Sequence, residues 1–139
     1  MANVLEGGCH CGKVRVELTT SIRPADFRPR ACDCSFCTKH GAAYVSDPDG
    51  RLRVTGSEML AEYRQGSGTA RMLLCRGCGV LVAAVLEEDG RRYGTVNAKC
   101  LEGVAFGEPQ AVSPQTLGVD DKKARWRRLW TPNVEICRS

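Results

Sequence analysis

Apolar and polar residues alternate along short stretches of this chain, and the alternation predicts many β-strands. It is clearest over residues 13–18, where three apolar residues alternate with three charged ones in the period of a half-buried strand. A turn sequence at 47–50 and a hairpin signal at 87–90 separate further apolar segments. These segments predict additional short strands at residues 42–45, 51–54, 59–63, 70–74, 80–86 and 91–96.

The C-terminal third is less regular, and one segment in it predicts a short helix. Residues 120–130 carry apolar side chains at helical spacing, and Asp120 or Asp121 is suited to cap the start of the helix. No internal repeat or linker-like segment divides the chain. We therefore expect a single domain over residues 1–139 with an all-β or nearly all-β fold.

Composition and charge exclude several classes of protein. The apolar fraction of 42% and the charged fraction of 26% are ordinary for a globular domain. The net charge of +4 is mild, so a nucleic-acid partner is not expected. The longest apolar run, residues 80–86, is too short to cross a membrane, and the N-terminus lacks a secretory pattern. We expect a cytoplasmic protein with reduced thiols, in which clustered cysteines bind metal rather than form disulfides.

Seven of the nine cysteines fall into three tight clusters, and their number predicts two zinc sites. Structural zinc takes four protein ligands, whereas catalytic zinc typically takes three and keeps one open position. Two clusters have two cysteines each, flanked by glycines that tolerate the tight turn of a metal-binding loop. Spacing alone does not decide which clusters meet, but we assign four cysteines to the closed structural site: Cys9, Cys11, Cys75 and Cys78.

The third cluster contains Cys32, Cys34 and Cys37 and is the candidate catalytic zinc site. Three thiolates make the ion a weak Lewis acid, poorly suited to activate water but able to accept a soft sulfur ligand. The predicted reaction therefore makes or breaks a bond between carbon and the sulfur of a small thiol. Two alternatives stay open for the fourth position: His40 is a ligand, or Cys100 or Cys137 completes a second structural site.

The sequence predicts less about the other residues around the clusters. His10 lies between two ligand cysteines and should point away from their ion. Cys100 is expected to be a small buried residue, and Cys137 a loose C-terminal thiol. Three polar side chains are candidates for lining the open site: Lys39, Tyr93 and Asn97.

The three clusters and their flanking residues resemble a known family. Gly8-Cys9-His10-Cys11-Gly12, followed by Cys32-x-Cys34-Ser35-x-Cys37 and Cys75-x-x-Cys78-Gly79, is similar to the glutathione-dependent formaldehyde-activating enzymes, a family that includes the centromere protein V domain. The resemblance covers a motif core of about residues 7–96 and leaves 97–139 as a C-terminal extension. Two positions depart from the family pattern: Asp33 stands where histidine is common, and Thr38 where arginine is common.

The resemblance implies a tent-like, mostly β zinc fold and a carbon–sulfur lyase activity. The structural zinc would be held by Cys9, Cys11, Cys75 and Cys78, and the catalytic zinc by Cys32, Cys34 and Cys37. The implied partner is glutathione or a similar small thiol, and the namesake substrate is S-hydroxymethylglutathione, the formaldehyde adduct. The departures at Asp33 and Thr38 change the surroundings of the ligands and therefore the choice of substrate.

The basic and aromatic segment 122–130 supports a different hypothesis. It suits an anionic partner, either nucleic acid or the carboxylates of a glutathione moiety. It equally suits a solvated helix that docks on the sheet through Trp126, Leu129 and Trp130. With the first interpretation, the chain would be a non-catalytic zinc-binding interaction module.

Overall fold

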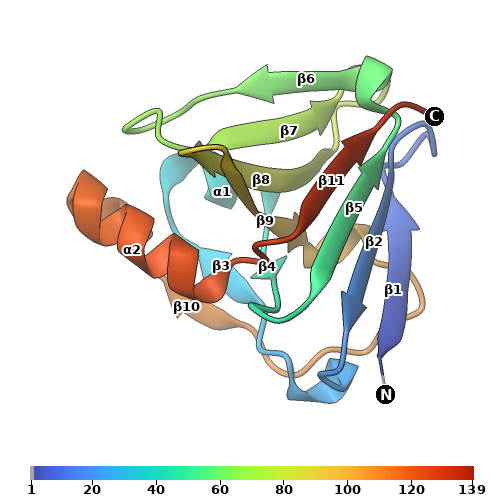
Figure 1. The fold of residues 1–139 in the computed structure, drawn as a ribbon, viewed down its shortest axis with the longest axis horizontal. Coiled ribbons are helices and arrows are strands. Elements are labelled where there is room, and N and C mark those ends of the chain that lie inside the picture. Colours follow the sequence, from blue (N-terminus) through green and yellow to red (C-terminus); the bar gives the residue numbers. More distant parts are fainter. Residues whose placement is uncertain (1) are drawn as a thin grey trace.

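The computed structural model describes residues 2–139, which form a mostly β domain of two sheets and few helices (Figure 1). The four-stranded sheet has the order β1-β2-β5-β11. Its strands are β1 (Asn3–Gly8), β2 (Arg15–Thr20), β5 (Arg51–Thr55) and β11 (Val134–Cys137). Neighbours are antiparallel, except that β11 runs parallel to β5.

The seven-stranded sheet carries the rest of the fold, with the order β10-β3-β4-β9-β8-β7-β6. Only the β10–β3 pair at its edge is parallel. The strands are β10 (Gln110–Val112), β3 (Arg30–Cys32), β4 (Tyr44–Val45), β9 (Arg91–Asn97), β8 (Leu81–Glu88), β7 (Arg71–Cys75) and β6 (Leu60–Tyr63).

The central strand β8 is buried on both faces because layers cover the seven-stranded sheet on either side. Its side chains alternate between two cores, with Val85 in one and Ala84 and Leu86 in the other. A bulge opposite Leu73 and Leu74 breaks the alternation, so that two successive residues of β8, Val82 and Ala83, enter the same core. The longest apolar run of the sequence is thus a central strand, not a membrane span.

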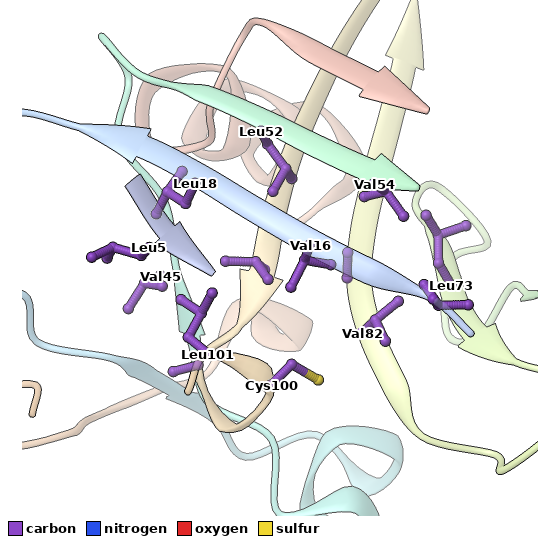
Figure 2. Packing of buried hydrophobic residues seen from close by; sticks show 14 of the residues in the cluster. Leu5, Val16, Leu18, Val45, Leu52, Val54, Leu73, Val82, Cys100 and Leu101 are labelled. Atoms are coloured by element: carbon purple, nitrogen blue, oxygen red, sulfur yellow. The ribbon is translucent and has the colours of Figure 1, made fainter. Parts of the chain in front are cut away.

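The first core fills the space between the two sheets (Figure 2). The four-stranded sheet contributes Val16, Leu18, Leu52 and Val54, each almost fully buried, and β8 contributes Val82 from the opposite side. At a typical 1.5–3 kcal/mol per buried aliphatic side chain, this layer is a main source of stability.

The helices gather at the other face of the seven-stranded sheet. Helix α1 (Ser35–His40) follows β3, and α2 (Val119–Leu129) lies beside β3, β4 and β10 (Figure 1). Trp126, Leu129 and Trp130 pack into the second core, as the docking interpretation of this segment predicted. Four 3-10 turns complete the elements: Pro24–Asp26, Ser57–Met59, Ala98–Cys100 and Pro114–Thr116.

Two local expectations were wrong. The residue that precedes α2 is Gly118, which has no side chain to cap the helix, and Asp120 and Asp121 lie in the first turn instead. There their charges still favour the positive end of the helix dipole. Cys137 is not a loose thiol, because β11 pairs it with Thr55 of β5.

The hairpin between β8 and β9 follows the sequence signal. Asp89 and Gly90 both have positive φ, 52° and 76°, as a two-residue turn of this twist requires. Strands β1, β3, β10 and β11 were not predicted, since they are short or mix apolar and polar residues irregularly. Among residues 2–139, no helix is long and apolar enough to span a membrane.

Candidate metal centres and active site

Cys9, Cys11, Cys75 and Cys78 converge at one place although they come from opposite halves of the motif core. Their sulfur atoms all lie within 4.8 Å of one another. The Sγ of Cys11 is 3.6 Å from those of both Cys9 and Cys75. Cys9 and Cys11 lie between β1 and β2, Cys75 ends β7 and Cys78 lies between β7 and β8, so the cluster joins the two sheets.

The backbone around this cluster is arranged as in metal-binding turns. The amide of Val14 donates to Cys9 Sγ at 3.3 Å, and that of Gly77 donates to Cys75 Sγ at 3.3 Å. Backbone hydrogen bonds from Cys11 and Val80 lower the pKa of Cys78 to about 6. Such bonds favour the thiolate, which is the form that binds metal.

Cys32, Cys34 and Cys37 form a second group whose sulfur atoms also lie within 4.8 Å of one another. Cys32 ends β3, Cys34 is the cap residue of α1, and Cys37 lies inside that helix. The Cys37 amide donates to Cys34 Sγ at 3.4 Å. A short loop from strand to helix therefore brings three thiols together within six residues of sequence.

The three thiols have unequal environments. A hydrogen bond with Cys37 lowers the pKa of Cys32 to about 6, and the same interaction, together with burial, raises the pKa of Cys37. The hydroxyl of Tyr44 is 3.2 Å from Cys37 Sγ. Burial, and then the charge of Cys37, raise the pKa of this tyrosine, so it stays a neutral hydrogen-bonding group beside the thiols.

No fourth ligand joins this group within residues 2–139. His40 is exposed at the end of α1 and packs against Phe36, with ring centroids 4.7 Å apart. The Cys100 thiol is buried and donates to the carbonyl oxygen of Leu81 at 3.5 Å, and Cys137 lies on β11. His10 is exposed between its two cysteines and belongs to neither group.

A pocket opens directly over the three thiols. Its empty volume is about 780 Å³, including the open space at its mouth, and its walls come from β3, β4, β7, β8, α2 and the loop that joins β6 to β7. Lys39, Tyr93 and Asn97 do not line it. Tyr93 is buried in the second core, and Asn97 donates to the Leu81 carbonyl oxygen at 2.9 Å.

Three cationic side chains line this pocket: Arg30, Lys122 and Arg125. No carboxylate in the described part of the chain lies within ion-pair distance of any of them. Lys122 is only 8% exposed, and its ammonium donates to Ser67 Oγ at 3.2 Å and lies 5.9 Å from the centre of the Trp126 ring, both neutral groups. Burying an unpaired charge is unfavourable, so the arrangement suits an anionic ligand.

Arg30 is fixed beside the thiols by neutral groups. Its Nη2 donates to Ser46 Oγ at 2.6 Å and to Thr95 Oγ1 at 3.3 Å. Burial, and then the nearby charge of Arg125, lower the pKa of Arg30 to about 10, so it stays charged at neutral pH. Residues two apart on a strand point to the same face, so Arg30 and Cys32 share one face of β3.

Asp33 anchors one wall of the pocket. Its carboxylate accepts hydrogen bonds from Ser113 Oγ at 2.6 Å and from the Gln115 side chain, and both bonds lower its pKa. Pro114, between these two donors, lines the pocket together with Gln115. Asp33, one of the two positions at which this chain departs from the resembled motif, thus holds a segment that is distant in sequence.

The sequence left the role of two cations open. Lys122 and Arg125 belong to the basic segment that suits either an anionic partner or a solvated helix, and they line the pocket with Trp126 and Leu129. A signal was present, because positions 122, 125, 126 and 129 have the spacing of a single helix face. By contrast, Lys123 and Arg127 pair with Glu88 outside the pocket.

Both cysteine groups have the donor chemistry of metal sites. Compact sets of thiols, with amides donating to sulfur, are consistent with zinc. All nine cysteines are free of disulfides, so every clustered thiol is available as a ligand.

Comparisons with known proteins agree with these features. The sequence model of a family described as glutathione-dependent formaldehyde-activating enzyme matches residues 4–117. A crystal structure of a Rhodobacter sphaeroides protein is similar at 36% identity and a TM-score of 0.61, covering 78% of this chain and 100% of that one. The family indicates an enzyme of glutathione-dependent formaldehyde activation. The chain belongs to the glutathione-dependent formaldehyde-activating enzyme family.

Proposed function

We propose that this protein is a carbon–sulfur lyase that acts on adducts of glutathione or a similar small thiol, of which S-hydroxymethylglutathione is the simplest. The observation that carries the proposal is the group of three thiols at a pocket with cationic walls. A thiol group without a fourth protein ligand is suited to a substrate sulfur, and the cations are suited to the carboxylates of glutathione.

The two cysteine groups have different proposed roles. Cys9, Cys11, Cys75 and Cys78 hold a structural zinc, since four thiols complete a tetrahedron and join two sheets. Cys32, Cys34 and Cys37 hold a catalytic zinc. When bound there, zinc supplies a Lewis-acidic position that stabilises the substrate sulfur as a thiolate.

The reaction itself needs one proton transfer and one bond cleavage. The hydroxyl of the adduct loses its proton, its oxygen forms the carbonyl double bond, and the electron pair of the carbon–sulfur bond leaves with sulfur, which takes up a proton to become the thiol. The products are an aldehyde and the thiol, and the reverse direction adds the thiol to the aldehyde.

The chain's residues bind and orient the adduct for this step. Lys122 and Arg125 bind carboxylates of the thiol moiety, whereas Trp126 and Leu129 form an apolar wall that excludes water. Tyr44 holds Cys37 in place through its 3.2 Å hydrogen bond.

The test is exchange between ¹³C-formaldehyde and its glutathione adduct, followed by NMR. Zinc-loaded wild type should accelerate the exchange and bind glutathione, and Cys34→Ser should lose both properties. Cys137→Ser is the matched control, because that thiol lies on β11 outside the pocket. Exchange that is no faster than without protein contradicts the proposal.

The interaction-module hypothesis receives no comparable support. Trp126, Leu129 and Trp130 pack inside the molecule, and Lys123 and Arg127 pair with Glu88. The side chains of the basic and aromatic segment therefore make contacts within the molecule and do not form a continuous exposed surface.

A further inference from the structure

The net positive charge of the pocket is larger than the net negative charge of the formaldehyde adduct of glutathione. Arg30, Lys122 and Arg125 are three cations, and no carboxylate lines the pocket to receive an ammonium group. Three thiolates with a divalent ion carry one negative charge, so an excess of two positive charges remains. The formaldehyde adduct carries two carboxylates and one ammonium and therefore balances only one of them.

Arg30 is the cation placed to meet the reacting end of the substrate. It lies two residues before Cys32 on the same face of β3, and both line the pocket. Its described hydrogen bonds all use Nη2, which leaves Nε and Nη1 without a protein partner among residues 2–139. Although they lack a partner, neither of these two nitrogens is a buried atom. Ser46, which orients the guanidinium, is itself fixed by donating to the Leu129 carbonyl oxygen at 2.7 Å.

The other two cations come from a different part of the chain. Lys122 and Arg125 belong to α2, which begins at Val119 and so lies beyond the residues that the family model matches. These two cations line the pocket from the helix and Arg30 lines it from the strand, with the charge of Arg125 near that of Arg30. The carboxylates of the thiol moiety suit the cations of the helix, and a carboxylate at the reacting carbon suits Arg30 on the strand.

We propose that the pocket takes the adduct of glutathione, or of a similar thiol, with a 2-oxo acid, and that Arg30 binds the carboxylate on the carbon attached to sulfur. The inference rests on the proposed function and names its substrate class. An added carboxylate brings the adduct to two net negative charges, which matches the pocket's excess of two positive charges. Cleavage proceeds as above: the hydroxyl proton is lost, the carbonyl forms, and sulfur leaves with the bonding pair and takes up a proton, giving the 2-oxo acid and the thiol.

Two stable glutathione thioethers test this proposal by calorimetry with the zinc-loaded full chain. S-carboxymethylglutathione carries a carboxylate next to sulfur, and S-carbamoylmethylglutathione has nearly the same size but a neutral amide. Wild type should bind the first at least about tenfold more tightly, which corresponds to about 1.4 kcal/mol. Arg30→Gln should reduce this preference to less than about twofold, and Arg30→Lys should restore part of it.

Two further variants separate the roles of the cations. Lys122→Met should weaken both thioethers by a similar factor and preserve the preference, since it removes a charge that serves the thiol moiety. Arg128→Gln, an exposed change on the same helix that does not line the pocket, should alter neither affinity. Circular dichroism of each variant verifies the fold.

Two results would overturn the proposal. One is that wild type binds both thioethers within about twofold; the other is that Arg30→Gln, correctly folded, keeps the preference. If the formaldehyde exchange is still accelerated in that case, the lyase function stands and only the 2-oxo acid is excluded. If no exchange occurs but the Arg30-dependent preference is present, the pocket binds the acidic adduct without acting on it as a lyase.

Discussion

The hydroxyl of Tyr44 lies 3.2 Å from Cys37 Sγ, and both residues are buried at the base of the pocket. This contact joins strand β4 to helix α1 and fixes the only one of the three thiols that lies inside a helix. Partners that orient a metal ligand typically change metal affinity by 10–100-fold when they are removed.

Tyr44→Phe should therefore weaken zinc at Cys32, Cys34 and Cys37 by about tenfold or more. The free energy of unfolding should fall by only about 1 kcal/mol, because one neutral hydrogen bond is lost without a change of shape. Competition with a chromophoric chelator measures the affinity. Tyr93→Phe, in the same apolar core but outside the pocket, is the control and should retain full affinity.

The four-cysteine group should matter more for stability than the three-cysteine group. Cys75→Ser removes a fully buried ligand that connects two sheets, and we expect a loss of about 4 kcal/mol or more. Cys34→Ser removes a ligand within one local loop, and its effect on the melting temperature should be clearly smaller. Thermal unfolding of both zinc-loaded variants makes the comparison, and equal losses would contradict the division into structural and catalytic sites.

The thiols should differ in their reaction with iodoacetamide after a mild chelator has removed zinc from the three-cysteine site. The pKa of Cys32 is lowered to about 6, so its thiolate dominates above that pH, and its alkylation rate should reach half its maximum near pH 6. Because this pKa lies below the ordinary thiol value, ionisation of Cys32 favours the folded state above about pH 8.5, and this contribution is lost as the pH falls through 6.

Mass spectrometry of the alkylated peptides measures each site. Cys100 is the internal control, since burial raises its pKa to about 12 and its thiol should stay unmodified across the same pH range. A pH midpoint for Cys32 near 8.5 would refute the hydrogen-bonded arrangement of the three thiols.

Asp33 should act as a positioning residue for the wall of the pocket. Asp33→Ala removes both acceptors of Ser113 and Gln115, and it should weaken glutathione binding by roughly three- to tenfold. Asp33→Asn keeps one acceptor oxygen and should recover most of the affinity. Hydrogen exchange of residues 113–117 should accelerate in the alanine variant alone, while Asp26→Ala, in the exposed 3-10 turn at 24–26, leaves it unchanged.

The sequence by itself determined the mostly β class, the central strands and the three local cysteine clusters. The reason is that strand alternation and the ligand spacing of metal turns are local properties of the chain. Only the tertiary structure decided which distant turns meet, because Cys9 and Cys75 approach through the packing of two sheets. The same holds for the pocket: Arg30 lies beside Cys32 on β3 locally, but Lys122 from α2 becomes a neighbour of the thiols only once the helix has docked on the sheet.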